Sequence, residues 1–81
     1  MMSPDQIQEL IQRALPGSEV VVQDMTGTQD HFQALVIATD FLGKSMVEQH
    51  QMVYQALGEN MKQAIHALSL QTYTPEQWKN K

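Results

Sequence analysis

The sequence predicts one small α+β domain in which a three-stranded mixed sheet is covered by helices. Two segments rich in β-branched residues lie on either side of a short polar loop, a long helical segment follows them, and a third strand segment comes after it. The expected order of elements is α-β-β-α(α)-β-α, in a single domain over residues 1–81. A chain of 81 residues can bury only one thin hydrophobic core.

The first helix is predicted by a start signal and an apolar stripe. Ser3 can cap the helix, Pro4 suits its first position, and Gln6 is placed to complete a capping box. The stripe at the helical period consists of Ile7, Leu10, Ile11 and Ala14. The Leu-Pro-Gly run at 15–17 is expected to end the helix.

Three strands are predicted, at residues 19–23, 31–39 and 66–73. The polar loop at 24–30 is short, and a short link favours antiparallel pairing of the first two strands. The second and third strands are joined by a helical crossover of about 25 residues, which usually makes such strands parallel.

The crossover is predicted to be a helix that begins after Ser45, because Ser45 and Glu48 form a capping-box signature. Gly58 is expected to break or kink this helix, and residues 59–65 to add another turn or two. The expected apolar stripe consists of Met46, Val47, His50, Val53, Tyr54 and Leu57.

A short closing helix is predicted at 74–78, where the start signal of the first helix recurs. Thr74 is the expected cap, Pro75 takes the first position and Gln77 the third. Trp78 is interpreted as a core plug that fastens this helix.

The composition limits the possible functions. The chain has no cysteine, so it forms no disulfide and supplies no thiolate. A formal net charge of −4 with five Lys and Arg argues against strong phosphate binding. No apolar run approaches the roughly 20 residues of a membrane span, and the first residues lack a secretory pattern. A soluble, cytoplasmic protein is the default expectation.

The Gly-Lys-Ser run at 43–45 resembles part of a phosphate-binding loop. The complete motif requires a glycine five residues before Gly43, where this chain has Ala38. We therefore interpret the run as a turn glycine followed by a capped helix.

Histidines are the candidate metal ligands. His50 falls in the long helix's apolar stripe and is interpreted as packed at the edge of the core, whereas His31 and His66 begin the second and third strands. If these strands are parallel neighbours, their starts lie about 4.8 Å apart at one edge of the sheet, and two imidazoles there could converge on one metal. Structural or solvated histidines are the alternative. Two imidazoles do not complete a tetrahedral site, so water, a carboxylate such as Asp24 or Asp30, or another molecule must supply the other ligands.

Four segments resemble the BolA family. They are HF at 31–32, FLGKS at 41–45, HQMVYQAL at 50–57 and IHALSLQTYTPEQW at 65–78. The last motif is long and specific, and the resemblance extends over residues 3–79. It implies a fold related to class II KH domains, and an accessory protein that is not an enzyme.

The resemblance also implies a partner and a cofactor. BolA-like proteins pair with monothiol glutaredoxins and share a bridging [2Fe–2S] cluster, to which the glutaredoxin cysteine and glutathione supply sulfur. The BolA-like partner supplies a histidine that matches His66 and a second Cys or His from the region between the first two strands, where His31 is the one such residue. The isolated chain is expected to be a monomer without a cofactor. The glutaredoxin-facing surface is expected around His66, with candidates Lys44, Lys62, Tyr73 and Pro75.

Nucleic-acid binding is the alternative, because BolA relatives have been associated with transcriptional regulation. KH domains clamp the backbone with a Gly-x-x-Gly loop, but the glycines here are at 17, 27, 43 and 58. Gln49 and Gln51 also replace the arginines usual beside the family's histidine. Weak DNA binding would be favoured if five basic residues gathered on one face: Arg13, Lys44, Lys62, Lys79 and Lys81. A module that binds glutaredoxin without metal is the third hypothesis.

Overall fold

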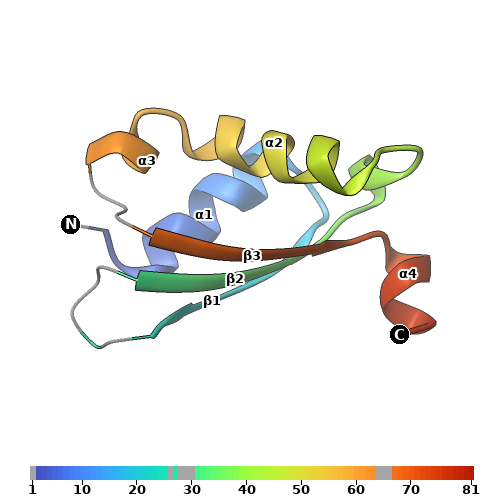
Figure 1. The fold of residues 1–81 in the computed structure, drawn as a ribbon, viewed down its shortest axis with the longest axis horizontal. Coiled ribbons are helices and arrows are strands. Elements are labelled where there is room, and N and C mark those ends of the chain that lie inside the picture. Colours follow the sequence, from blue (N-terminus) through green and yellow to red (C-terminus); the bar gives the residue numbers. More distant parts are fainter. Residues whose placement is uncertain (1, 26, 28–30, 64–66) are drawn as a thin grey trace.

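The computed structural model describes residues 2–25, 27, 31–63 and 67–81, and it has two layers (Figure 1). A three-stranded sheet forms one layer, and helices α1 and α2 lie together on one side of it. The elements are α1 (Pro4–Ala14), β1 (Glu19–Asp24), β2 (His31–Ile37), a 3-10 turn (Thr39–Phe41), α2 (Met46–Leu57), α3 (Asn60–Gln63), β3 (Ala67–Tyr73) and α4 (Pro75–Lys79). The predicted order and the α+β class are confirmed.

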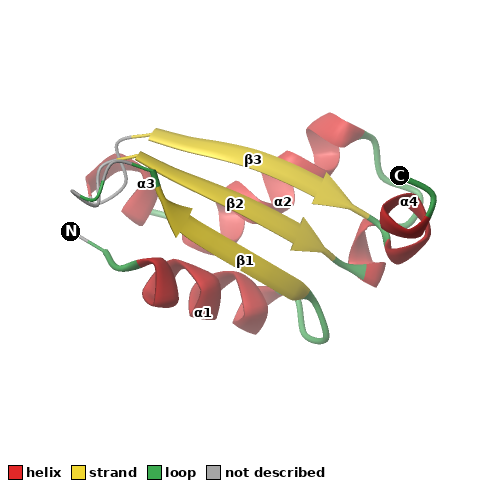
Figure 2. Cartoon of the chain, turned by 90° about the horizontal axis from the view of Figure 1, so that it is seen from below, coloured by secondary structure: helices red, strands yellow, loops and turns green. Residues whose placement is uncertain are grey.

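The sheet has the order β1-β2-β3, with β1 antiparallel and β3 parallel to β2, as predicted. His31 lies opposite Ala67 at the start of the parallel pair, and Ile37 lies opposite Tyr73 at its end. Strand β2 is two residues shorter than predicted, because the chain turns into the 3-10 helix that begins at Thr39. In Figure 2 the strands cross in front of α2, so among the described elements no helix covers this second face.

All three predicted helix starts carry a complete capping box. In each, the cap's hydroxyl oxygen accepts a backbone N–H, and the side chain three residues later accepts the cap's N–H, at distances from 2.8 to 3.2 Å. The pairs are Ser3 with Gln6, Ser45 with Glu48, and Thr74 with Gln77. Gly58 ends α2 in a backbone conformation with φ of 56°, which confirms the predicted break.

The core lies between the sheet and the two long helices. Its largest fully buried side chains are Ile7 and Ile11 of α1, Phe32 and Val36 of β2, Phe41 of the 3-10 turn, and Val53 and Leu57 of α2. The predicted stripe of α1 is partly wrong: Ala14 is exposed, and Leu15, where the helix ends, is buried instead.

The predicted apolar stripe of α2 is also partly wrong. Met46 and Val47 are 69% and 66% exposed, and the helix buries Gln49 together with Val53 and Leu57. These three residues are four positions apart along the helix and therefore share one face. Met46 and Val47 belong to the outer face.

Trp78 is not a core plug. Its side chain is 39% exposed, and its ring packs on Tyr73 with ring centroids 5.3 Å apart. Helix α4 therefore lies against the end of β3 through a surface aromatic pair.

Candidate functional site

The starts of β2 and β3 form the strand edge at which the sequence predicts metal ligands. His31 is exposed and stands on the same face of β2 as Gln33 and Leu35, since successive strand residues alternate between faces. Ala67 lies directly opposite His31, and His66 precedes Ala67 in the sequence. The predicted adjacency of the two strand starts is confirmed, whereas His66 itself lies outside the described residues and its role stays a prediction.

Carboxylates are the other donors considered for this edge. Asp24 ends β1 opposite Phe32, and its carboxylate accepts the backbone N–H of Gly27 at 3.0 Å. Asp30 lies outside the described residues. Within residues 2–25, 27, 31–63 and 67–81, no three His, Cys, Asp or Glu side chains gather into a metal-binding group.

Three of the four predicted glutaredoxin-facing residues, Tyr73, Pro75 and Lys44, belong to the other end of the molecule. Tyr73 ends β3 and Pro75 begins α4, whereas Ala67 begins β3 six positions before Tyr73. A strand of that length spans about 20 Å. Lys44 and Tyr73 are both among the residues that line one pocket. Lys62 belongs to α3, and its side chain is not among those described. A partner that contacts both the strand edge and Tyr73 would have to extend along β3.

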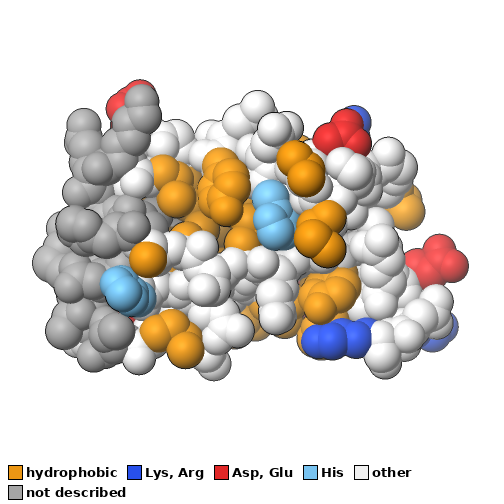
Figure 3. All heavy atoms as spheres, in the orientation of Figure 1, with side chains coloured by type: hydrophobic (Ala, Val, Ile, Leu, Met, Phe, Trp, Pro, Cys, Tyr) orange, Lys and Arg blue, Asp and Glu red, His pale blue; other side chains and the backbone are white. Residues whose placement is uncertain are grey.

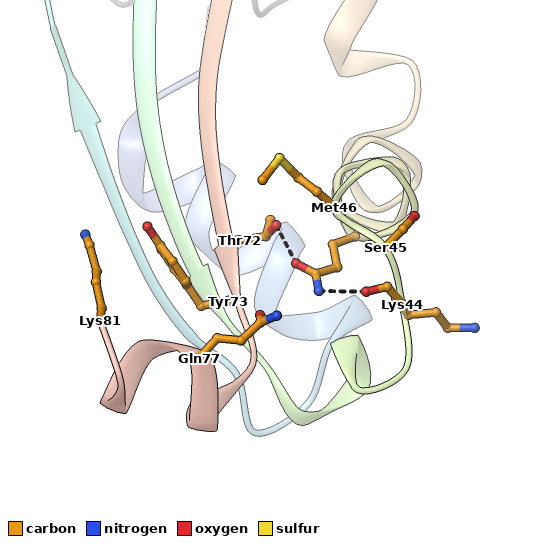
Figure 4. Close-up of a pocket in the computed structure, with 8 residues that line it drawn as sticks. Lys44, Ser45, Met46, Thr72, Tyr73, Gln77 and Lys81 are labelled. Atoms are coloured by element: carbon orange, nitrogen blue, oxygen red, sulfur yellow. Dashed lines mark hydrogen bonds between the residues drawn. The ribbon is translucent and has the colours of Figure 1, made fainter.

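A pocket of about 480 Å³ lies where α2 begins and β3 ends (Figure 4). Its floor is a buried polar pair: the Thr72 hydroxyl donates to the Gln49 carboxamide oxygen at 2.8 Å. The Gln49 amide donates to the backbone carbonyl of Lys44 at 3.1 Å and to that of Phe41 at 3.5 Å. The pocket is lined by Lys44, Ser45, Met46, Gln49, Thr72, Tyr73, Gln77 and Lys81. Sequence reasoning missed this floor, although Gln49 stands at helical spacing from Val53 and Leu57.

The outer face of α2 carries exposed apolar side chains, and hydrophobic atoms gather on this side of the molecule in Figure 3. They are Met46, Val47 and Tyr54, and Leu42, which follows the 3-10 turn, is exposed as well. His50 is half-buried beside them, and its ring meets that of Tyr54 edge to face, with centroids 6.5 Å apart. The expectation that His50 packs at the edge of the core is compatible with this position.

The basic residues do not all gather on one face. Lys44 and Lys81 line the pocket and Lys79 lies in α4, whereas Arg13 lies in α1 and forms an ion pair with Glu9. The basic side chains visible in Figure 3 lie toward the end of the molecule that carries α4. The arrangement predicted to favour DNA binding is met only in part.

Glu48 is the group whose titration the structure shifts most clearly. Its carboxylate accepts the backbone N–H of Ser45, and this hydrogen bond, followed by one with the Ser45 side chain, lowers the pKa of Glu48 below its ordinary value. Lys44 lowers it further by its charge. The capping box therefore keeps Glu48 ionised beside the start of α2.

The fold and its strand edge define a class of small α+β domain, in which an antiparallel pair of strands is extended by one parallel strand across a helical crossover. The family model described as "BolA-like protein" matches residues 11–77. The chain belongs to the BolA family.

Relatives and solved structures agree with this assignment. The chain is 42% identical over 53 residues to a "DNA-binding transcriptional regulator BolA" of Haemophilus influenzae, and this match covers 65% of the chain and 52% of that relative. It is 29% identical over 85 residues to the Escherichia coli protein of the same description, covering 96% of the chain and 81% of the relative. The chain thus spans about half the length of the Haemophilus protein.

Among solved structures, a bolA protein homologue from Coxiella burnetii superimposes with a TM-score of 0.83 at 36% identity, covering 98% of the chain and 99% of the homologue. BolA1 from Arabidopsis thaliana gives a TM-score of 0.82 at 27% identity, with 94% and 96% covered. The Haemophilus and Escherichia relatives are described as regulators, and a mouse relative is described as a BolA-like protein. In the described part of the chain, no helix has the length and apolar character to cross a membrane.

Proposed function

We propose that the chain is an accessory protein that shares a bridging [2Fe–2S] cluster with a monothiol glutaredoxin and glutathione, and that it acts in cluster trafficking or iron sensing. The observation that supports this proposal is the parallel register of β2 and β3. It puts exposed His31 opposite Ala67, the residue that follows His66 in the sequence. The chain provides imidazole at this edge and the partner provides sulfur.

The donor set agrees with a shared cluster better than with a site built from this chain alone. No cysteine is present, so any thiolate must come from another molecule. Neutral imidazole in place of thiolate reduces the negative charge of a [2Fe–2S] centre and raises its reduction potential, as in Rieske centres. A histidine ligates only when unprotonated, so binding should weaken as the pH falls toward or below about 6.5, the reference pKa of histidine.

The test is anaerobic mixing of the chain with a monothiol glutaredoxin, glutathione, iron and sulfide, followed by visible absorption and circular dichroism. His66→Ala should abolish the spectrum of the mixed complex, and His31→Ala should change or weaken it. His50→Ala is the matched control, because His50 lies in α2 and not at the strand edge. A mixed-complex spectrum retained by His66→Ala would rule out His66 as a ligand.

Calorimetry in the absence of iron distinguishes the cluster proposal from the hypothesis of a module that binds glutaredoxin without metal. Binding that survives both chelation and His66→Ala, while no cluster spectrum forms with the wild type, would replace the cluster proposal with this simpler one.

DNA binding is the second candidate, and the descriptions of the Haemophilus and Escherichia relatives favour it. The structure adds that Lys44, Lys79 and Lys81 belong to the same end of the molecule. Fluorescence anisotropy with duplex DNA at about 0.15 M salt tests it, because phosphate contacts weaken steeply with salt. Lys44→Gln should weaken binding and Arg13→Gln should not. Equal effects of the two substitutions would show a response to net charge alone.

A further inference from the structure

Strand β3 is an outer strand of the sheet, with a free edge on the side away from β2 (Figure 2). The Tyr73 carbonyl accepts the N–H of Ala38, which follows β2, so the backbone groups of Tyr73 are directed toward β2. Because this direction alternates along a strand, Leu68, Leu70 and Thr72 direct their N–H and C=O groups outward. Within the part of the chain that the structure describes, these outward backbone groups have no hydrogen-bond partner.

The two outer strands differ in how they are protected against further pairing. Natural edge strands are protected by charged side chains, prolines or bulges. Strand β1 begins with Glu19 and ends with Asp24, whereas β3, with the sequence ALSLQTY, contains no charged residue, no proline and no glycine. Its register with β2 advances one residue at a time, without a bulge. The edge of β3 is therefore the one suited to accept another strand.

The pocket at the end of β3 has walls on both faces of that strand (Figure 4). Met46 and Thr72 lie on the side of α2, whereas the Tyr73 ring and Lys81 lie on the other side of β3. These walls do not converge on one compact ligand. They do suit an added strand, because successive side chains of a strand alternate between the two faces of the sheet.

The side of the edge that faces the helices is apolar. Leu68 and Leu70 are half-buried and pack against the core, and Met46 of α2 is 69% exposed. In Figure 3, hydrophobic side chains gather over α2, and the charged side chains of this view lie toward its margins. Apolar side chains at alternate positions of an added strand would complete the burial of these residues.

The other side of the edge carries a positive charge. The Lys81 ammonium lies 5.2 Å from the centre of the Tyr73 ring and 5.0 Å from that of the Trp78 ring, so the cation is held beside the end of β3. The pocket lining includes Lys44 and Lys81 and no Asp or Glu, although the chain has a formal net charge of −4. The Lys44 side chain turns outward (Figure 4), so Lys81 is the cation that an added strand would meet. A complementary strand has an acidic side chain where it passes Tyr73.

A peptide suits this edge better than a nucleic acid or a second copy of the chain. The alternating N–H and C=O groups of the edge match the main chain of an extended peptide. Nucleic-acid binding relies on clustered cations, and the residues of β3 carry no charge. Self-pairing of two uncharged β3 strands would bring no acidic side chain to Lys81.

We propose that the free edge of β3 binds an extended segment of a partner protein, which pairs antiparallel with β3 as a fourth strand. Its apolar side chains pack against Met46, Leu68 and Leu70, and an acidic side chain near Tyr73 meets Lys81. The antiparallel direction is chosen because it is slightly more stable per residue than the parallel one.

The test is a ¹H–¹⁵N NMR titration of the full chain with the acetylated and amidated heptapeptide Glu-Val-Thr-Val-Thr-Val-Thr, which has the length of β3. In the free chain, the outward N–H groups of Leu68, Leu70 and Thr72 should exchange with solvent faster than that of Gln71, which is directed toward β2. The peptide should bind with a Kd on the order of 0.1 mM. At ten times that concentration, it should slow the exchange of the three outward amides by about tenfold. Saturable binding without this protection would overturn the proposal.

Two N-methylated versions of the peptide give a matched control. In the antiparallel pairing the valines stand opposite Leu68, Leu70 and Thr72, so the valine N–H groups point toward β3 and those of the threonines point away from it. N-methylation of the valines should abolish binding, whereas N-methylation of the threonines should leave it nearly unchanged. Equal binding of the two versions would refute strand addition.

A charge reversal tests the cationic side of the edge. Lys81→Glu should weaken binding of the peptide by about fivefold, because one exposed ion pair is replaced by repulsion, and a peptide that begins with lysine instead of glutamate should regain affinity. Lys79→Glu is the control, since it makes the same change of charge in α4 but lies outside the pocket lining. Equal effects of the two substitutions would show nonspecific attraction and count against the proposal.

The other occupants of this edge would give different results. If a second copy covers β3, the three outward amides become protected as the protein concentration rises without peptide. If a nucleic acid covers it, single-stranded DNA protects these amides and the peptide does not. Either result would replace the proposed occupant. The titration contains no iron and no glutaredoxin, so this proposal and the cluster proposal fail separately.

Discussion

The buried Gln49–Thr72 pair should make an unusually large contribution to stability for two neutral side chains. Gln49→Leu preserves an apolar stem but removes the acceptor of the Thr72 hydroxyl and a donor to the Lys44 carbonyl. The Phe41 carbonyl keeps a partner, since it also accepts the Lys44 N–H at 3.0 Å. Two polar groups therefore lose their partner: the hydroxyl of the buried Thr72 and the part-buried Lys44 carbonyl.

Each buried group left unpaired costs about 1–3 kcal/mol, so Gln49→Leu should lower the free energy of unfolding by about 2–3 kcal/mol. Thr72→Val leaves the Gln49 carboxamide oxygen without its hydrogen-bond donor and should lower the free energy of unfolding by about 1–2 kcal/mol. The double variant should lose less than the sum, with a coupling of about 1 kcal/mol, because the second substitution removes a group that the first left unpaired. For a domain of this size, total stability is only about 4–12 kcal/mol.

The assay is urea unfolding followed by far-UV circular dichroism and by the fluorescence of Trp78. With an m-value of about 1 kcal/mol/M, Gln49→Leu should shift the midpoint down by about 2 M. Gln51→Leu, an exposed position on the same helix, is the control and should stay within about 0.5 kcal/mol of the wild type. The reasoning is refuted if Gln49→Leu lowers the free energy of unfolding no more than Gln51→Leu does. It is also refuted if the losses of Gln49→Leu and Thr72→Val simply add in the double variant.

Three further predictions concern single residues. Because the pKa of Glu48 is lower in the folded chain than in the unfolded chain, where it is about 4.3, ionised Glu48 stabilises the fold above that pH, and this stabilisation is lost as the pH falls through the folded pKa. Glu48→Gln should therefore make the urea midpoint less dependent on pH in the acid range. An unchanged pH dependence would contradict this prediction. Gly58→Ala should cost about 1 kcal/mol or more in thermal unfolding, because the φ of 56° suits glycine, whereas an added Cβ would make only an ordinary contact with the Gln55 carbonyl oxygen at 3.9 Å; Glu59→Ala is the neutral control. Trp78→Ala should cost about 1 kcal/mol and speed hydrogen exchange in α4, whereas a loss of about 3–5 kcal/mol would restore its interpretation as a core residue.

The sequence was informative wherever the signal was local. Capping boxes at Ser3, Ser45 and Thr74 and the break at Gly58 depend on neighbours within four residues, and all four were predicted. The sheet pairing also followed, because the lengths of the two connections restrict the strand directions.

The rotation of α2 about its axis was not predictable in the same way. Two faces of this helix carry apolar residues at helical spacing, one with Met46 and Tyr54 and one with Val53 and Leu57. The buried face is the one that contains Gln49, because its amide meets carbonyls of the preceding turn and a hydroxyl from β3, and the sequence does not reveal those partners. The pocket depends on the same tertiary contacts.

The proposed site was predictable as a strand edge and no further. The start of β2 opposite the start of β3 follows from the parallel crossover, and His31 is at that edge. Tyr73, Pro75 and Lys44 were grouped with it by resemblance, but a strand of seven residues separates the two ends. Sequence proximity to His66 gave no indication of that separation.

The parallel pairing of β2 with β3 has a kinetic consequence. The hairpin of β1 and β2 closes over a short stretch of chain, but β3 joins only after the whole helical crossover has been laid across the sheet. Contacts between residues so distant along the chain form slowly. A ligand bound by the starts of both β2 and β3 would therefore bind only after β3 has paired with β2. Such a ligand would stabilise the folded chain, and the hairpin of β1 and β2 alone could not bind it.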